Sequence, residues 1–271
     1  MGFPPENPTQ QGNKMKKIAV ITGGTSGLGK ELKKLYENDG YTVCNLSRSC
    51  DDESADEYAC DVTDEAQVNA AVEKIAKKYG RIDALINNAG AGLLGATELV
   101  DTAAVRRVFD VSYYGALHVT RACLPHMMRG GRIAFICSIA AFIPVPFRSV
   151  YSSAKAAELM LGEALRLELK GAGICVTCIC PGEIRTNFSA NRICDAGRTA
   201  RYGDRPAAAL KHIEEKTPKR MSAEKAAKKI YKKCTKGKKA VYVIGGKYRF
   251  FRFMQKRLPD TMFLNLTDKF S

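Results

Sequence analysis

The chain has 271 residues, of which 45% are hydrophobic. It is therefore long and apolar enough to form one α/β domain with a substantial core. It has no run of about 18 apolar residues and no apolar N-terminal stretch, so neither a transmembrane helix nor a signal peptide is predicted. We therefore expect a cytoplasmic protein whose ten cysteines are free thiols, with no metal site at "ICVTCIC" (174–180). The net charge of +15 is local, because residues 201–257 hold 19 Lys and Arg against 4 Asp and Glu.

The order of apolar runs along the chain predicts the fold class. Residues 1–14 are polar and rich in Pro, Gly, Asn and Gln, and we expect a disordered leader there. Apolar runs predict strands at 17–22, 41–46, 57–62, 82–87, 131–138, 174–180 and 240–245. Helical spacing predicts helices at 28–40, 64–80, 102–128, 150–171 and 222–234. Strands that alternate with helices indicate a doubly wound α/β fold, here a single domain over 15–245 with seven parallel strands flanked by helices.

A glycine-rich turn, "TGGTSGLG" (22–29), lies between the first strand and the first helix. Gly23, Gly27 and Gly29 let the backbone approach a pyrophosphate, and the helix N-terminus offers unpaired N–H groups and a positive dipole. This strand-to-helix context favours dinucleotide binding over a purely geometric turn. Thr25, Ser26 and Leu28 belong to the same turn and are candidate contacts.

The end of the second strand is expected to face the adenosine ribose of such a dinucleotide. It reads "NLSRS", with Ser47 and Arg48 where a carboxylate would select NAD(H). Arg48 could pair with a 2′-phosphate, so the sequence favours NADP(H) as the cofactor. The alternative is that Arg48 is a solvated loop arginine.

Several motifs stand in a single order along residues 17–245, and together they resemble the short-chain dehydrogenase/reductase family. They are TGxxxGxG at 22–29, "NNAG" at 87–90, Ser138 at the end of the fifth strand, YxxxK from Tyr151 to Lys155, and "PG" at 181–182. The resemblance implies a Rossmann fold and oxidoreductase activity with a nicotinamide cofactor. It also implies further cofactor contacts, namely Asp61, Val62, Asn87, Asn88, Ala89, Gly90, Pro181, Gly182, Ile184 and Thr186.

The spacing of Tyr151 and Lys155 places a phenol and an ammonium on one face of a helix. An ammonium nearby favours the phenolate, which suits the phenol for proton transfer. By resemblance, Tyr151 is the general acid/base, Lys155 also holds the nicotinamide ribose, and Ser138 hydrogen-bonds the substrate oxygen. Each of these side chains could instead be structural: Tyr151 a core phenol, Lys155 a surface charge and Ser138 a strand-end hydroxyl.

The chain departs from the family pattern at Ser112, where the family usually has an Asn three residues before a glycine, here Gly115. In the family that Asn helps to hold a water that links the Lys to solvent. We expect Ser112 to take part in catalysis as a reduced form of this relay.

The residues that follow Ser138 and the sixth strand predict the substrate class. Apolar residues at 142–147 could wall a pocket, a layout similar to hydroxysteroid and retinol dehydrogenases. We therefore expect a small apolar carbonyl or alcohol of steroid- or lipid-like character. A substrate lid is expected at about 187–220, where Arg192, Arg198, Arg201 and Arg205 could receive an anionic group or form a solvated face, which we favour.

The basic C-terminal extension at 246–271 leaves other functions open. Aromatic and basic residues alternate at 246–259, which suits a peripheral contact with an anionic membrane; the alternative is a helix folded over the substrate cleft or a subunit contact. A catalytically weak protein that binds nucleic acid or a membrane through its basic half is the alternative to an enzyme, although specific nucleic-acid binding is not expected. By analogy with the family, a homodimer or homotetramer is expected through 102–128 and 150–171.

Overall fold

The computed structural model describes residues 16–50, 52–186, 193–195, 201–216 and 220–269. The predicted leader at 1–14 lies outside the described residues, as do Arg192 and Arg198. Within the described residues, no helix combines the length and apolar character needed to cross a membrane.

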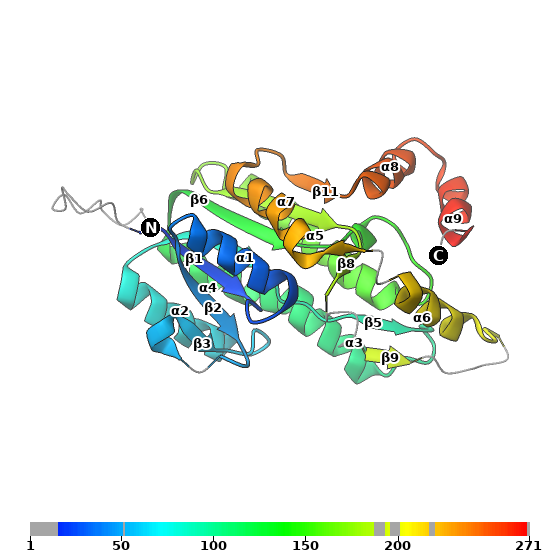
Figure 1. The fold of residues 1–271 in the computed structure, drawn as a ribbon, viewed down its shortest axis with the longest axis horizontal. Coiled ribbons are helices and arrows are strands. Elements are labelled where there is room, and N and C mark those ends of the chain that lie inside the picture. Colours follow the sequence, from blue (N-terminus) through cyan, green and yellow to red (C-terminus); the bar gives the residue numbers. More distant parts are fainter. Residues whose placement is uncertain (1–15, 51, 187–192, 196–200, 217–219, 270–271) are drawn as a thin grey trace.

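Seven strands form one parallel sheet in the order β11-β7-β6-β4-β1-β2-β3, which confirms the predicted doubly wound fold (Figure 1). The strands are β1 (Ile18–Thr22), β2 (Thr42–Ser47), β3 (Glu57–Ala59), β4 (Ile82–Asn87), β6 (Met127–Ile136), β7 (Cys175–Pro181) and β11 (Val241–Ile244). The chain order reverses at β1, which has β2 on one side and β4 on the other. Ligands of such sheets bind outside the carboxyl ends of the strands at this switch point.

Helices cover both faces of the sheet. They are α1 (Gly27–Asn38), α2 (Glu65–Tyr79), α3 (Thr102–Phe109), α4 (Gly115–Cys123), α5 (Ser149–Glu168) and α7 (Ala223–Lys236). α1 and α7 pack together on one face, where Leu32 and Ile230 join the core, while α2, α4 and α5 cover the other face through Val68, Val119 and Leu159. The buried residues recur at helical spacing because each helix presents one apolar stripe to the sheet.

The helix expected at 102–128 is interrupted in the structure. A π-helical turn, Asp110–Tyr114, joins α3 to α4, and a 3-10 turn, Leu124–His126, ends the helical stretch. Pro125 in this turn cannot continue the helical hydrogen bonds, and Met127 pairs with Ile82 of β4. The fifth strand of the sheet therefore begins at Met127 rather than at the predicted residue 131.

Short elements and two C-terminal helices complete the fold at the carboxyl ends of the strands. β5 (Leu93–Gly95) pairs with β9 (Ile193–Asp195), and β8 (Ile184–Arg185) pairs with β10 (Met221–Ser222). The last helices are α6 (Arg205–Lys216), α8 (Gly246–Gln255) and α9 (Asp260–Lys269). Figure 1 shows α8 and α9 beyond the end of β11, on the side opposite the marked N-terminus.

Candidate active site

A cavity of about 1350 Å³ opens where the parallel strands end. Every predicted catalytic or cofactor-binding residue except Ser112 and Asn87 lines it. Those residues are Gly23, Thr25, Ser26, Gly27, Leu28, Gly29, Ser47, Arg48, Asp61, Val62, Asn88, Ala89, Gly90, Ser138, Tyr151, Lys155, Pro181, Gly182, Ile184 and Thr186. The fold thus brings together side chains that are separated by more than a hundred residues in the sequence.

The glycine turn at one end of the cavity fits a dinucleotide. Gly23 and Gly27 have φ values of +67° and +52°, which favour glycine, and a Cβ on Gly29 would lie 2.1 Å from the carbonyl oxygen of Gly23. The first turn of α1 contains no acidic residue, and the side chain of Ser26 does not cap it. Its N–H groups and dipole are therefore available to an anion such as a pyrophosphate.

Two asparagines hold this turn in place. The side-chain amide of Asn88 donates to the carbonyl oxygens of Thr22 (2.9 Å) and Gly23 (3.2 Å). The side-chain oxygen of Asn45 accepts from the N–H of Gly24 at 2.8 Å. The turn is therefore preorganised by the buried side chain of Asn45 on β2 and the half-buried side chain of Asn88 after β4.

Hydroxyl groups gather at the end of β2, where a 2′-phosphate would lie. The Oγ1 atom of Thr25 is 3.2 Å from the Oγ atom of Ser47 and accepts from the hydroxyl of Ser49 at 3.4 Å. Arg48 is exposed beside them and also lines the cavity. Ser49, which sequence reasoning missed although it follows Arg48 directly, adds a third hydroxyl to this end of the cavity.

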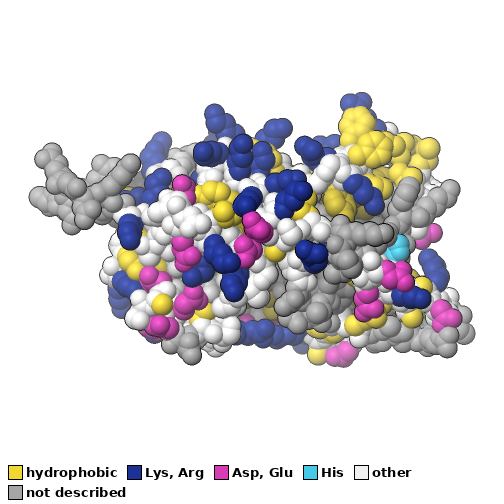
Figure 2. All heavy atoms as spheres, in the orientation of Figure 1, with side chains coloured by type: hydrophobic (Ala, Val, Ile, Leu, Met, Phe, Trp, Pro, Cys, Tyr) yellow, Lys and Arg dark blue, Asp and Glu magenta, His cyan; other side chains and the backbone are white. Residues whose placement is uncertain are grey.

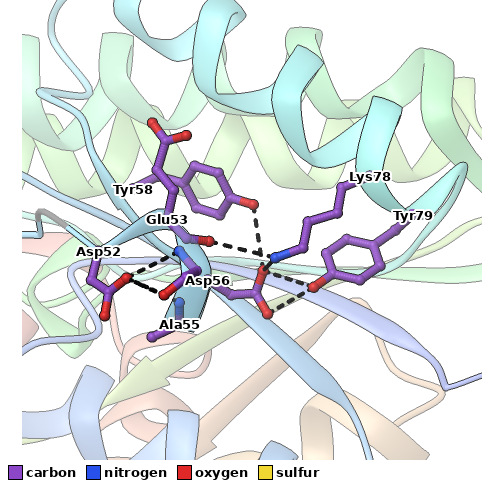
Figure 3. A network of polar contacts seen from close by, with 8 residues as sticks. Asp52, Glu53, Ala55, Asp56, Tyr58, Lys78 and Tyr79 are labelled. Atoms are coloured by element: carbon purple, nitrogen blue, oxygen red, sulfur yellow. Dashed lines mark hydrogen bonds and ion pairs between the residues drawn. The ribbon is translucent and has the colours of Figure 1, made fainter.

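The segment after Arg48 and Ser49 is anchored to α2. Figure 3 shows the carboxylate of Asp56 accepting from the hydroxyl of Tyr79 (2.7 and 2.8 Å) and from the ammonium of Lys78 (2.7 Å). Asp52 caps the 3-10 turn Glu53–Ala55 of the same segment. This network fixes the connection between β2 and β3 and so limits where Arg48 can lie.

Tyr151 and Lys155 lie one turn apart on α5, and both are buried. The ammonium of Lys155 donates to the carbonyl oxygen of Ile136 at 3.0 Å, at the end of β6. Ser138 follows that strand, and its Oγ atom accepts from the N–H of Ala140 at 3.2 Å, so its own proton remains available for another acceptor. The guanidinium of Arg148 lies 4.7 Å from the centre of the Tyr151 ring, a cation that the sequence analysis did not predict.

Lys155 also forms a buried ion pair with Glu158, another residue that the sequence analysis did not single out. The Nζ atom of Lys155 lies 2.6 Å from the Oε2 atom of Glu158, and the side chains are 4% and 0% exposed. Burial, the largest single influence, lowers the pKa of Lys155, but Glu158, Tyr151 and Cys137 together raise it, so the net direction is up. Burial raises the pKa of Glu158 well above its usual range, and Lys155 opposes that shift only in part. The 2.6 Å contact with the Lys155 ammonium is that of an ion pair, which favours the carboxylate over the acid. The signal in the sequence is a Glu three residues after the Lys, inside an otherwise apolar stripe.

Ser112 and Asn87 lie behind the cavity rather than in its wall. Ser112 is fully buried in the π-helical turn, and its hydroxyl accepts from the N–H of Ala91 at 3.4 Å. The side-chain amide of Asn87 donates to the hydroxyl of Thr120 on α4 at 2.9 Å. The structure thus places both as supports for the segment after β4, and within the described residues no hydrogen bond joins Ser112 to Lys155.

The opposite end of the cavity is mostly apolar. Its wall contains Ile139, Ile143, Pro144, Val145, Pro146, Phe147, Ala208, Ala209, Ile213, Tyr248 and Phe251. Phe147 adopts a left-handed conformation (φ +60°), which is unusual for a bulky residue and is frequent near functional sites. Phe142, expected in this wall, instead lies under the guanidinium of Arg252 at 3.6 Å from the ring centre.

Of the four arginines expected to form a solvated face, Arg201 and Arg205 lie within the described residues, and both are exposed and form surface ion pairs. Arg201 pairs with Glu98 at 2.7 Å, and Arg205 pairs with Asp268 of α9 at 3.4 Å while its side chain lies over Phe147. Arg205 lines the cavity as well, so it lies at the border between solvent and the apolar wall.

All ten cysteines are free thiols, and the described residues contain no cluster of His, Cys, Asp and Glu that could hold a metal.

Comparisons with known proteins agree with this geometry. Residues 17–196 match the family model described as short chain dehydrogenase. The chain is 33% identical over 242 residues to dehydrogenase/reductase SDR family member 7B of Mus musculus, covering 83% of this chain and 72% of that protein. It is 35% identical over 204 residues to 3-ketodihydrosphingosine reductase of Bacteroides thetaiotaomicron, covering 73% and 76% of the two chains.

Solved structures share the whole architecture. A short-chain dehydrogenase from Streptomyces avermitilis superposes with a TM-score of 0.77 at 27% identity, over 93% of this chain and 96% of that one. Other structures of this fold were determined with NADP and with NAD, so the fold holds nicotinamide cofactors of both kinds. This chain therefore belongs to the short chain dehydrogenase family of oxidoreductases.

Proposed function

We propose that this protein is an NADP(H)-dependent oxidoreductase that interconverts a carbonyl and a secondary alcohol on an apolar, steroid- or lipid-like substrate. The observation that carries the proposal is the shared cavity. One end has the glycine turn and Arg48, the middle has Ser138, Tyr151 and Lys155, and the far end is apolar. The alternative of a catalytically weak binding protein is not favoured by the family or by this arrangement.

The residues of the chain divide the chemistry between them. The bound cofactor supplies or accepts the hydride. In carbonyl reduction the Tyr151 hydroxyl gives its proton to the substrate oxygen, and in alcohol oxidation the phenolate takes that proton back. The Ser138 hydroxyl donates a hydrogen bond to the same oxygen, and the Lys155 ammonium stabilises the phenolate.

The preference for NADP(H) rests on the end of β2. Arg48 offers a cation to a 2′-phosphate, and the hydroxyls of Thr25, Ser47 and Ser49, which hydrogen-bond to one another here, could turn to donate to it. A carboxylate in the place of Ser47 would repel that phosphate and accept the 2′-hydroxyl of NAD(H).

The substrate class rests on the apolar wall and on one relative. Aliphatic and aromatic side chains from three separate segments form that wall, which suits a long or bulky hydrocarbon. The similar protein named 3-ketodihydrosphingosine reductase supports a ketone on a long-chain lipid. Arg201 and Arg205 are paired with carboxylates, so they give no support for an anionic substrate.

We further propose a homodimer or homotetramer formed through α4 and α5. Met160 and Leu167 on α5 are 65% and 76% exposed, and Tyr114 just before α4 is 47% exposed. Covering such side chains is favourable in an assembled protein. Light scattering of the purified protein measures its mass in solution, and a monomer at all concentrations would contradict this assembly.

A reductase assay tests the proposed activity. The purified protein is mixed with NADPH or NADH and with 3-ketodihydrosphingosine, a ketosteroid or the small polar ketone acetoacetate. Absorbance of the reduced cofactor is then followed. We expect consumption of NADPH faster than that of NADH, with at least one apolar ketone and not with acetoacetate. A preference for NADH, or for the polar ketone, would contradict the proposal.

A further inference from the structure

The helix α8 has two contrasting faces. Tyr248 and Phe251 point to the inside, where they line the cavity and pack with Ile139 and Ile143. Phe250 and Phe253, three residues apart, are 59% and 55% exposed on the outside. A helix that buries one aromatic face and exposes another has an unpartnered apolar surface.

The helix α9 extends this surface. Phe263 is buried against the same cluster, and Thr267 and Asp268 line the cavity. Met262 and Leu264 are 57% and 48% exposed. Both C-terminal helices thus wall the cavity on one side and present large apolar side chains to solvent on the other.

Basic side chains lie beside the exposed phenylalanines of α8, whereas Asp260 and Asp268 are exposed on α9. Arg249, Lys256 and Arg257 are exposed on or next to α8, which has no Asp or Glu, and the guanidinium of Arg257 lies 5.5 Å from the ring centre of Phe253. Figure 2 shows hydrophobic side chains gathered at this end of the molecule, with Lys and Arg beside them. This apolar surface with basic neighbours, on α8 and α9, is called here the C-terminal surface.

We propose that the C-terminal surface binds the face of an anionic lipid bilayer. Exposed Phe, Met and Leu side chains can enter the boundary between headgroups and acyl chains, while Lys and Arg attract anionic headgroups. A nucleic acid would bind the positive charges but would leave the aliphatic side chains uncovered. A second copy of this chain would present another positively charged surface, which repels the first. The bilayer therefore matches both features of the surface.

Binding in this orientation would place the cavity next to the membrane. Lipid-like molecules could then reach the apolar wall past α8 and α9 without crossing bulk water. This route rests on the proposed function. Binding of the bilayer does not rest on it, and that binding can be measured without substrate or cofactor.

Co-sedimentation with vesicles tests the proposal. Phosphatidylcholine vesicles are compared with vesicles that also contain phosphatidylserine, at low and at high salt. We expect the full chain to pellet with the anionic vesicles and to be released by salt. The double variant Phe250→Ser/Phe253→Ser should bind at least about tenfold more weakly, because each buried Phe contributes about tenfold or more to such transfer.

A pair of charge variants separates a local site from net charge. Arg249→Glu/Lys256→Glu should weaken binding at least about 25-fold, since each basic residue at an anionic surface contributes about fivefold. Lys229→Glu/Lys232→Glu on α7 changes the net charge equally, from exposed positions outside the C-terminal surface, and should weaken binding much less. Circular dichroism and thermal melting check that each variant is folded.

Other outcomes would overturn the proposal. The proposal is wrong if the wild-type chain does not pellet with the anionic vesicles. It is also wrong if the two charge variants lose vesicle binding to the same extent. Retention of binding by a folded phenylalanine variant would show attraction by charge alone. Tighter binding to a DNA oligonucleotide than to vesicles would identify a nucleic-acid surface, and loss of dimers in the phenylalanine variant without vesicle binding would identify a subunit contact.

Discussion

The two ends of the cavity are built in different ways. At the cofactor end, the backbone turn after β1 is held by hydrogen bonds with the side chains of Asn45 and Asn88. At the substrate end, side chains of α8, α9 and the segment after β6 pack against one another, and α6 adds further lining residues. The cofactor end is therefore shaped by side-chain hydrogen bonds to the backbone, whereas the substrate end is shaped by apolar packing. We expect substitutions at the two ends to separate cofactor choice from substrate choice.

The largest effect is expected at the point where the two ends meet. Tyr151→Phe keeps the ring but removes the hydroxyl that exchanges a proton with substrate. Turnover should fall by about 10²- to 10⁴-fold, which is the usual contribution of a general acid or base. NADPH binding, measured by fluorescence titration, should be nearly unchanged. Wild-type turnover in the variant would show that another group moves the proton.

The next effect should be confined to the cofactor end. Arg48→Ala removes a charged hydrogen-bond donor, which contributes roughly 1.5–3 kcal/mol. NADPH should therefore bind about ten- to a hundredfold more weakly, while NADH is largely unaffected. Dissociation constants of both cofactors test this, with Arg106→Ala, an exposed arginine of α3 outside the cavity wall, as the matched control. Equal losses for the two cofactors would indicate a structural role for Arg48.

A smaller effect is expected from the ion pair behind the catalytic lysine. The Glu158 carboxylate lies 2.6 Å from the Lys155 ammonium and partly cancels its field. Glu158→Gln removes this negative charge, so the phenolate needed for alcohol oxidation should form at lower pH. The acid limb of kcat/KM for oxidation should then move to lower pH. The exposed Glu168→Gln on the same helix is the control, and a limb that stays in place or moves up would contradict this role of Glu158.

The smallest effect is expected at Ser112. Its hydroxyl accepts from Ala91 behind the cavity, and the amide of an Asn could accept the same hydrogen bond. Ser112→Asn should leave turnover unchanged or raise it, while the extra volume at a fully buried position lowers the melting temperature. Steady-state rates below the melting transition test this. Collapse of activity in a folded variant would mean that the site depends on Ser112 itself.

The sequence predicts the sheet and the cofactor end well because both follow from local signals. Alternating strands and helices predict the parallel sheet, and the glycine turn predicts the N-terminus of α1. The break at the π-helical turn has no comparable local signal. Phe142 was expected in the cavity wall, but its ring lies under Arg252, more than a hundred residues away in the chain. The role of Glu158 depends on the burial of its side chain beside Lys155. The sequence has one Glu in an apolar stripe there, and this pattern suggests burial without establishing it.

The central claim is that residues at the end of β2 determine cofactor choice and do not determine substrate choice. A substitution that inverts the cofactor preference tests this claim most directly. Ser47→Asp places a carboxylate where it would repel a 2′-phosphate and accept a ribose hydroxyl. The measurement is kcat/KM for NADPH and NADH in wild type and variant, with the KM of the same apolar ketone. We predict that wild type prefers NADPH, that the variant prefers NADH, and that the KM of the ketone is unchanged. A wild type that prefers NADH, or a variant whose ketone KM shifts together with its cofactor preference, would contradict the account.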